Sequence, residues 1–362
     1  MREISPLIIS WFRKNMRPLP WRKEKNAYHI LLSEVIMQQT RMEQGLPYFF
    51  KIVEAFPTIE TLAATDEELL LRYWQGLGYY SRARNLHATA KNIVENYNGL
   101  IPNSFLELKK MKGIGAYTAA AIASVAFDEP VPVIDGNVMR VVARLFGIED
   151  PVNGNEGKNK IQQCLHTIFD TKQPGIFNEA IMEFGALQCI PFNPNCKKCP
   201  LKKHCVAYKT AKVHLLPTKN PAKEVKTRYL NYLFLLIDEH STLMRQRRSN
   251  DIWKNLYEFP LIETTQPPTE KQLHSLYFWK SLPFFYDKIK LSFKQTFHYQ
   301  HKLTHRLLKV TFTVAAMTSF YGKPPDNFVL ITLPETESKP KPVLINKFLN
   351  DVVCNERQKR TE

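Results

Sequence analysis

The chain of 362 residues is long enough for two domains of ordinary size, each with a core that needs no disulfide support. Its composition, with 44% hydrophobic and 23% charged residues and no apolar run near twenty residues, is typical of a globular protein in water and contains no candidate for a membrane-spanning helix. The net charge of +16, from 50 Lys and Arg against 34 Asp and Glu, indicates a polyanionic partner, and basic residues beside tight turns and aromatic residues favour nucleic acid.

The N-terminal segment has a short apolar patch, but it carries Glu3 and no small-residue cleavage site, so it does not match a secretory signal peptide. We therefore expect a cytoplasmic protein. In that reducing compartment clustered cysteines are more often metal ligands than disulfides.

Residues up to about 206 have helical periodicity, with apolar residues at spacings of three and four. The first candidate for chemistry lies in "YHILLSEVIMQQT", where Glu34 shares a helical face with Leu31, Val35 and Gln38. A glutamate in such a stripe commonly extends to solvent. If it is buried instead, its pKa is raised, and the protonated carboxyl can act as an acid near neutral pH.

Two helical segments flank Gly113-Ile114-Gly115. The glycines permit a tight turn, after which a helix begins with its amide groups exposed and its positive dipole end outward. Such an end binds a backbone phosphate without reading sequence. An ordinary turn between helices uses the same glycines, but Lys112 and its neighbours Lys109 and Lys110 favour the phosphate interpretation.

In "VPVIDGNVMRVVARLFGI", Asp135 follows an extended apolar run and precedes a helix expected to begin near Val138. An aspartate at this position is usually a helix cap. The same helix end stabilises the ionised carboxylate. One carboxyl held neutral and one held charged is the division of labour needed to cleave a C–N or C–O bond at a sugar.

Four of the six cysteines, Cys189, Cys196, Cys199 and Cys205, fall within seventeen residues. Their spacing contains one C-x2-C knuckle rather than the two of a zinc ribbon, so it favours an iron–sulfur cluster over zinc. Because all four positions would be ligands, none is left for a substrate, and the role is structural. The lysines between the cysteines make this loop a candidate phosphate clamp.

Residues 207–228 are polar, basic and contain two prolines, which predicts an extended linker. Beyond it the hydrophobic period changes to two, as in "LLKVTFTV", where Leu308, Val310, Phe312 and Val314 alternate with polar residues. The segment 229–362 is therefore predicted to be an α+β domain that closes with a helix around "VLINKFLNDVV".

The cysteine spacing, the glycine hairpin and "VPVIDGNVMRV" together resemble the helix-hairpin-helix DNA glycosylases of the endonuclease III class. Within that class, "LPWR", "SEVIMQQT", "WQGLGYYSRARNLH", "GIGAYTAAAI" and "NEAIMEFGALQC" resemble the MutY family of adenine DNA glycosylases over nearly the whole chain. The resemblance implies a mainly α catalytic domain at 1–206, a [4Fe-4S] cluster on the four cysteines, and an α+β, Nudix-like domain at 229–362.

The resemblance also implies the reaction, which is hydrolysis of the N-glycosidic bond of adenine opposite 8-oxoguanine or guanine in duplex DNA. Glu34 matches the family residue that protonates the adenine, first at N7. Asp135 matches the residue that stabilises or covalently traps the oxocarbenium-like sugar. Tyr117 and Asn137 match residues that support this site.

Further positions carry over from the same motifs. Trp21, Arg22 and Glu179 correspond to walls of the adenine pocket, and Gln39 and Tyr79 to residues that enter the base stack. Such residues fit the need to extrude a base before chemistry can reach it. The backbone-binding hairpin corresponds to Lys112, Gly113 and Gly115, although the family usually has proline where this chain has Lys112.

The C-terminal domain resembles the MutT-like domain of the family, which recognises 8-oxoguanine on the opposite strand. It lacks the acidic helix of Nudix hydrolases, so nucleotide hydrolysis is not expected. The family's Phe-Ser-His loop aligns with Leu303, Thr304 and His305, and a second register would use Phe297 and His298. In the first register, Leu303 replaces the family's aromatic residue, while Thr304 keeps a hydroxyl group.

Two alternatives remain open. A bifunctional glycosylase and lyase for oxidised pyrimidines would resemble endonuclease III, but such enzymes have lysine where this chain has Tyr117, and a phenol cannot form their Schiff base. A non-enzymatic iron–sulfur DNA-binding protein would explain the charge and the cysteines but not the paired carboxyls. A monomer suffices for one lesion and is the expected state.

Overall fold

The computed structural model describes residues 3–221, 224–283, 290–318 and 324–359. The chain divides into two compact units. Residues 1–64 and 85–222 form one, which we call the helical unit, and residues 65–84 and 223–362 form the other, which we call the sheet unit.

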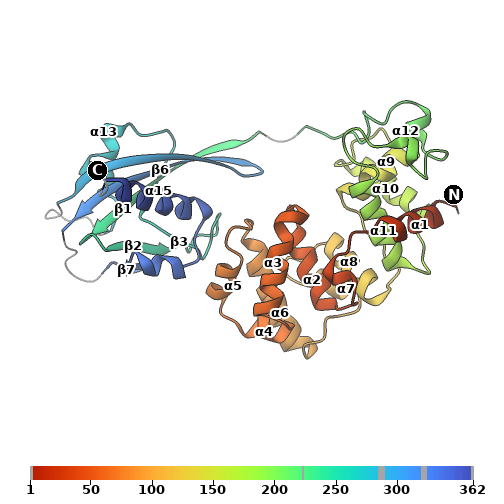
Figure 1. Ribbon diagram of the computed structural model, residues 1–362, viewed down its shortest axis with the longest axis horizontal. Coiled ribbons are helices and arrows are strands. Elements are labelled where there is room, and N and C mark those ends of the chain that lie inside the picture. The colour runs from red at the N-terminus through yellow and green to blue at the C-terminus, as the bar shows by residue number, and fades with distance from the viewer. Residues whose placement is uncertain (1–2, 222–223, 284–289, 319–323, 360–362) are drawn as a thin grey trace. The chain divides into compact units, whose positions relative to one another are not determined.

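The helical unit contains the following elements (Figure 1): α1 (Ile4–Asn15), η1 (Pro20–Arg22), α2 (Ala27–Met37), α3 (Met42–Ala55), α4 (Ile59–Ala64), most of α6 (Ser81–Tyr97), α7 (Phe105–Lys110), α8 (Ala116–Phe127), α9 (Gly136–Phe146), α10 (Asn155–Ile168), α11 (Pro174–Leu187), η2 (Cys196–Lys198) and α12 (Val206–Lys209). The described part of this unit has no strand, so the predicted helical character of residues up to 206 is confirmed.

The core that positions the site lies where α11 packs against α1, α8 and α9. Helix α8 is rich in alanine, the strongest helix former, and its small side chains let neighbouring helices approach closely. Helix α11 contributes Phe177 and Phe184, both at most 1% exposed. Truncating either phenylalanine to alanine would cost about 3–5 kcal/mol. These helices therefore form a rigid support for whatever side chains point away from the core.

The sheet unit contains α5 (Glu67–Tyr73) and the following elements: β1 (Lys226–Ile237), β2 (Ser241–Gln246), β3 (Tyr257–Glu258), β4 (Leu261–Thr264), α13 (Glu270–Leu273), α14 (Leu276–Trp279), β5 (Ser292–Lys302), β6 (Arg306–Met317), β7 (Phe328–Thr332), η3 (Pro334–Ser338) and α15 (Val343–Lys359). The strand order is β3-β2-β1-β6-β5, with β4 also pairing with β1 and β7 with β2. Strands β1 and β6 run parallel in the centre, while β5 and β6 form a long antiparallel hairpin.

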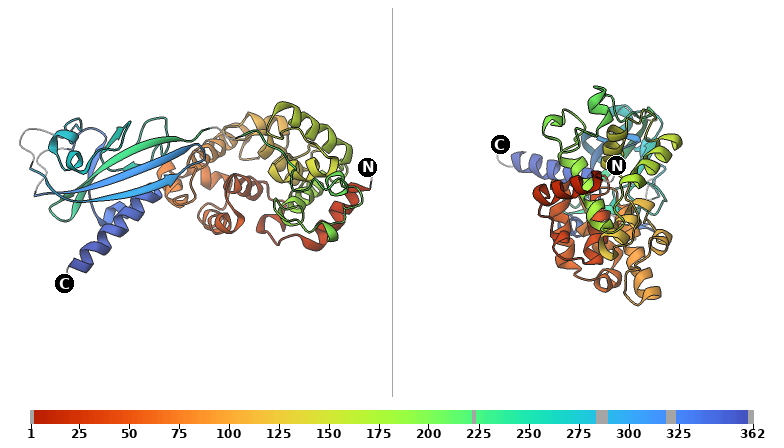
Figure 2. Two further views of the ribbon diagram at one scale, coloured as in Figure 1. Left: turned by 90° about the horizontal axis from the view of Figure 1, so that it is seen from above. Right: turned by 90° about the vertical axis from the view of Figure 1, so that its right-hand side faces the viewer.

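Alternation along β1 and β6 sends side chains into a core on each face of the sheet. In β1, Tyr232 and Phe234 belong to one core, and Leu233 and Leu235 to the other. Helix α15 lies across the first face (Figures 1 and 2), where Phe348 stacks on Phe312 of β6 with ring centroids 4.2 Å apart. The predicted period of two and the closing helix are both confirmed.

The segment predicted as an extended linker, 207–228, differs from that prediction in its first part. It begins inside α12, and it then bonds to the helical unit, where Val152 N donates to Thr218 O (3.0 Å) and Asn220 N donates to Asn153 Oδ1 (2.8 Å). Strand β1 already starts at Lys226. Polarity and prolines do not reveal such hydrogen bonds, because they depend on the partner surface. Residues 65–84 also group with the sheet unit, whereas the sequence predicts one domain at 1–206.

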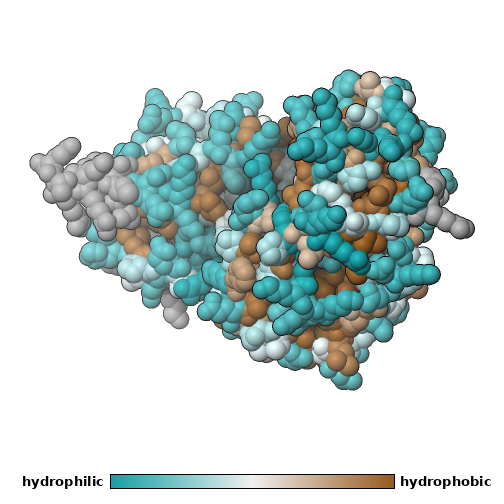
Figure 3. All heavy atoms as spheres, turned by 45° about the vertical axis from the view of Figure 1, so that its right-hand side comes forward, coloured by the Kyte–Doolittle hydropathy of each residue, from teal (hydrophilic) through white to brown (hydrophobic). Residues whose placement is uncertain are grey.

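Most of the face seen in Figure 3 is hydrophilic, with smaller hydrophobic areas between the polar side chains. Among the residues that the structure describes, no helix has both the length and the apolar character needed to cross a membrane.

Candidate active site

Glu34 lies on α2, which begins after Asn26, whose side chain accepts hydrogen bonds from the Tyr28 and His29 amides. The neighbours of Glu34 on the helix are buried, and Glu34 itself is half-buried. Burial raises its pKa to about 7. The nearby carboxyls of Asp135 and Glu179 add to this rise, while a hydrogen bond from Tyr117 and the charge of Arg22 oppose it. Glu34 is thus partly withdrawn from solvent rather than fully extended into it.

Asp135 is the N-cap of α9, as expected from its place in the sequence. Its Oδ1 accepts from Val138 N (2.7 Å) and its Oδ2 accepts from Asn137 Nδ2 (2.8 Å). These hydrogen bonds lower its pKa, but burial outweighs them and the net pKa is raised. The hydrogen bonds at the helix end favour the ionised carboxylate, as expected, while burial acts against them. Burial of the carboxyl removes more water than the cap replaces.

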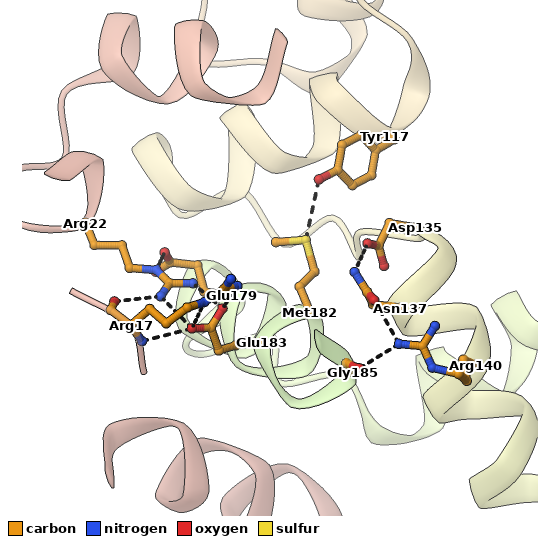
Figure 4. Close-up of polar contacts among 10 residues, drawn as sticks. All are labelled: Arg17, Arg22, Tyr117, Asp135, Asn137, Arg140, Glu179, Met182, Glu183 and Gly185. Atoms are coloured by element: carbon orange, nitrogen blue, oxygen red, sulfur yellow. Dashed lines mark hydrogen bonds and ion pairs between the residues drawn. The ribbon is translucent and has the colours of Figure 1, made fainter. Parts of the chain in front are cut away.

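Asn137 is fixed from the side opposite Asp135 (Figure 4). Arg140, one turn further along α9, donates from Nη2 to Asn137 Oδ1 (2.9 Å) and to Gly185 O (2.6 Å). A Cβ at Gly185 would lie 2.7 Å from the Asn137 Cβ, so only glycine lets α11 come this close. Arg140 was missed from the sequence, although an arginine inside the apolar run "VMRVVARLF" indicates a buried charge with a dedicated partner.

Tyr117 stands on the first turn of α8, two residues after the glycine hairpin. Its hydroxyl donates to the sulfur of Met182 on α11 at 3.6 Å (Figure 4). Burial and the Glu34 and Asp135 carboxyls raise its pKa far above the ordinary value, so the phenol stays neutral at every physiological pH. It can donate a hydrogen bond to Glu34 but cannot act as a base.

The three predicted pocket-wall residues lie together. Trp21 in η1 is buried against Phe49 of α3, with ring centroids 4.9 Å apart. Arg22 Nε donates to Glu179 Oε1 of α11 at 2.9 Å. The structure adds two residues that the sequence analysis missed, Arg17 and Glu183, which bond to each other and to Arg22. Glu183 could have been found from its spacing, because it stands four residues after Glu179 on the same helical face.

The residues predicted to enter the base stack and one glycine of the predicted backbone-binding hairpin have positive φ angles. Gln39, just beyond α2, has φ 56° and Tyr79 has φ 47°, both in the left-handed region, and both side chains are exposed. Backbone strain of this kind concentrates at functional sites. In the hairpin, Gly113 has φ +81°, and a Cβ there would lie 2.5 Å from the Asn85 side chain. Gly115 is the N-cap of α8, and Lys112 is exposed beside it.

A separate cavity of about 330 Å³ lies within the sheet unit. Tyr79, Thr304 and His305 line it, and the Tyr79 hydroxyl bonds to Thr304 Oγ1. Thr304 and His305 occupy the turn between β5 and β6. Phe297 of the second register is instead in the body of β5, where it packs on Phe348 at a centroid distance of 5.4 Å. The geometry therefore favours the first register.

The four clustered cysteines are free thiols, and they belong to the loops after α11. Burial raises the pKa of Cys199 to about 12, and the closeness of the other three thiols adds to the rise. Arg144 of α9 holds the loop, donating to Ile190 O (2.7 Å) and Pro191 O (2.8 Å). Within the described ranges, no group of three or more His, Cys, Asp or Glu side chains is arranged to hold a metal ion. The donor set, four thiols without a disulfide, fits a thiolate-ligated cluster.

Comparison with known proteins assigns both regions. A family model described as HhH-GPD superfamily base excision DNA repair protein matches residues 32–166, and a model described as NUDIX domain matches residues 232–351. The adenine DNA glycosylase of Buchnera aphidicola subsp. Acyrthosiphon pisum (strain APS) is 34% identical over 257 residues, covering 71% of this chain and 73% of the relative. That of Buchnera aphidicola subsp. Schizaphis graminum (strain Sg) is 36% identical, covering 72% and 75%.

A solved structure of a DNA glycosylase also resembles part of this chain. The structure of a thermostable thymine-DNA glycosylase matches with a TM-score of 0.53 and 26% identity, covering 58% of this chain and 97% of that chain. The fold is thus shared with glycosylases for a different base. The fold alone does not select the base, so specificity has to be argued from the pocket residues.

Proposed function

The chain belongs to the adenine DNA glycosylases, a family of DNA N-glycosylases in base excision repair, and we propose that it releases adenine paired with 8-oxoguanine or guanine in duplex DNA. The observation that carries this proposal is the carboxyl pair of Glu34 and Asp135. One pKa is raised to about 7, and the other carboxyl is bound to the amide groups of Val138 and Asn137.

The order of protonation follows from these surroundings. Burial, and to a lesser extent the charge of Asp135, raises the pKa of Glu34 to about 7, so a proton is held on Glu34 near neutral pH. Glu34 donates that proton to N7 of an extruded adenine, which makes the base a better leaving group. The C1′–N9 bond then breaks with its electron pair on the base, and positive charge develops on the sugar.

Asp135 acts in the second half of the reaction. Its carboxylate stabilises the oxocarbenium-like sugar by charge or by a transient bond to C1′. Asn137 and the Val138 amide fix its two oxygens, so the carboxylate need not reorganise as the sugar charge develops. Water then adds to C1′, and its proton leaves through Glu34, now ionised. The single hydroxyl proton of Tyr117 can leave the Met182 sulfur and be donated to Glu34 once Glu34 is ionised, and this hydrogen bond then orients the carboxylate.

Recognition of the opposite base is assigned to the sheet unit. The cavity lined by Tyr79, Thr304 and His305 offers two hydroxyl groups and a ring nitrogen within one opening, as a base edge requires. Gln39 and Tyr79, exposed on strained turns, fill the stack from which the adenine has left. The hairpin at Gly113 and Gly115 and the exposed Lys112 bind the backbone phosphates.

Cys189, Cys196, Cys199 and Cys205 would hold a [4Fe-4S] cluster, which supplies no step of base release and stabilises a lysine-bearing loop. Metal binding to the thiols would require their deprotonation, so the bound state is coupled to folding. Replacing one of these cysteines by serine is expected to reduce folding or DNA affinity first. A variant that folds and binds DNA normally yet fails only in adenine release would contradict this assignment.

The direct test presents the protein with duplexes that carry adenine opposite 8-oxoguanine, guanine or cytosine. Strand breaks are compared with and without hot alkali. We expect adenine release opposite 8-oxoguanine and guanine, and breaks only after alkali, since Tyr117 cannot form the imine of a lyase. No release opposite 8-oxoguanine would overturn the proposal, and breaks without alkali would indicate a lyase.

A further inference from the structure

Beneath the pocket wall, a carboxylate on α11 joins two arginines (Figure 4). Glu183 is 2% exposed. It accepts from the Arg17 amide (2.9 Å), from Arg17 Nε (2.9 Å) and from Arg17 Nη2 (2.7 Å). It also accepts from Arg22 Nη1 and Nη2, both at 3.2 Å. Glu183 is therefore the common acceptor of the two guanidinium groups.

These contacts determine the orientation of Arg22. Its Nη1 donates to Arg17 O (3.0 Å) as well as to Glu183, and its Nη2 is tied to Glu183. A guanidinium is planar and rigid, so anchoring both terminal nitrogens fixes the direction of the remaining N–H group. That group is Nε, which donates to Glu179 Oε1 at 2.9 Å. By holding the terminal nitrogens of Arg22, Glu183 directs the Arg22 Nε–H group toward Glu179.

Two of the side chains so placed act on the charge of Glu34. The groups that act on Glu34 are Tyr117 of α8, Asp135 at the start of α9, Glu179 of α11 and Arg22 of η1. Two of these four belong to the assembly that Glu183 organises. Its own carboxyl, held by two guanidinium groups, has its pKa lowered to about 2 and stays charged over the whole working range.

We propose that Glu183 is a positioning residue that holds Arg22 against Glu179 and thereby adjusts the electrostatic field at Glu34. This inference rests on the proposed function, in which Glu34 donates a proton. Glu183 lies behind Arg22 and acts through it, whereas Arg17 offsets its charge from the other side. The assembly of Arg17, Arg22, Glu179 and Glu183 carries no net charge when both carboxyls are ionised, so loss of one member leaves an uncompensated charge near the acid.

The inference makes opposite predictions for two substitutions. Glu183→Gln keeps the shape but removes a negative charge, which favours the ionised form of Glu34 and lowers its pKa. The alkaline fall in adenine release then moves to lower pH, by about half a pH unit. Arg17→Gln removes a positive charge, so the same fall moves to higher pH. A role in packing alone would reduce the rate at all pH values and shift neither profile.

The experiment is a single-turnover measurement of adenine release opposite 8-oxoguanine between about pH 6 and pH 9 for the wild type and each variant. Glu183→Asp serves as the matched control, because it retains the charge and should keep the wild-type profile at a reduced rate. If Glu183→Gln does not fold, Arg17→Gln decides, since the Arg17 side chain is 33% exposed and its loss is better tolerated.

Failure of this inference is distinguishable from failure of the proposed function. If the wild type releases no adenine, the proposed function is wrong and the inference falls with it. If the wild type is active and the profiles of Glu183→Gln and Arg17→Gln coincide with its own, only the inference is overturned. Shifts of opposite sign support it, and shifts of the same sign contradict it.

Discussion

The pKa values of two carboxyls in this chain, Asp251 and Glu34, are shifted in opposite directions. In the sheet unit, Asp251 accepts from Arg228 (2.7 Å), Arg247 (3.0 Å) and Arg306 (2.8 Å), and these guanidinium groups hold its pKa well below the usual range even though burial opposes them. In the helical unit, Glu34 forms no ion pair in the described part of the chain, and its pKa is raised to about 7.

The difference separates two kinds of carboxyl. A structural carboxyl is kept ionised by ion pairs, and a chemical carboxyl keeps a proton that it can donate in the reaction. A guanidinium partner fixes a carboxylate in the charged form, because a proton would have to displace two or three strong hydrogen bonds. A desolvated carboxyl without such a partner keeps its proton until near neutral pH, at a cost to stability. The pocket contains both kinds side by side, since Glu183 is paired with Arg17 and Arg22 while Glu34 is not.

The largest expected effect tests the chemical side of this comparison. Glu34→Gln removes the proton donor, and Asp135→Asn removes the charge that stabilises the sugar. Each should lower the single-turnover rate of adenine release by about 1000-fold or more, with duplex binding retained. Exposed Glu54 on α3 offers a matched control, and Glu54→Gln should leave the rate unchanged. Wild-type rates in either pocket variant would sink the mechanism.

The next effect tests the structural side. Asp251→Asn removes one carboxylate from three arginines, of which Arg228 keeps Glu263 and Arg247 keeps Glu258 as partners. We expect the sheet unit to lose about 3 kcal/mol of stability. Urea denaturation followed by a probe in this unit measures the loss. Asp238→Asn, at an exposed turn that asparagine also tolerates, is the control. Adenine release per bound complex should stay within about twofold. A large fall in that rate without loss of stability would place Asp251 among the chemical carboxyls.

The comparison also shows how far the sequence alone could reach. Helical spacing placed Glu34 on an apolar face, and the position of Asp135 at a helix start was correct. The net direction of the Asp135 pKa could not be predicted, because it depends on how far tertiary packing buries the carboxyl, which a local sequence pattern does not give. The pairing of Arg17 with Glu183 spans 166 residues. It depends on how α1 and α11 pack, which no local pattern encodes.

A third prediction concerns the stability cost of the unpaired acid. Below about pH 4.5 Glu34 is protonated in both the folded and the unfolded chain, and its contribution to stability is fully present. As pH rises to about 7 and beyond, the unfolded chain gains from ionising it while the folded chain resists, so stability is lost. Glu34→Gln should therefore be more stable than wild type by about 2–3 kcal/mol at pH 8, and equal to it at pH 4. Equal stability at both pH values would contradict the raised pKa.

The smallest expected effect concerns the hydrogen bond between Tyr79 and Thr304. This contact joins two neutral hydroxyl groups and involves no carboxyl. Thr304→Val removes the Oγ1 atom at nearly constant shape, and a neutral hydrogen bond contributes about 1 kcal/mol. We expect the preference for adenine opposite 8-oxoguanine over guanine to fall about fivefold. The ratio of single-turnover rates on the two duplexes measures it.

Thr304→Ser is the matched control for this last effect, since it keeps the hydroxyl and should preserve the preference. The rate opposite guanine should be the same in all three proteins, because the proposed proton transfer and sugar stabilisation use no atom of Thr304. If the ratio of rates opposite 8-oxoguanine and guanine is unchanged in Thr304→Val, the Thr304 hydroxyl does not recognise the opposite base. His305 would then be the next residue of the cavity to test. Discrimination between opposite bases would then rest on His305, whose ring presents one donor and one acceptor when neutral.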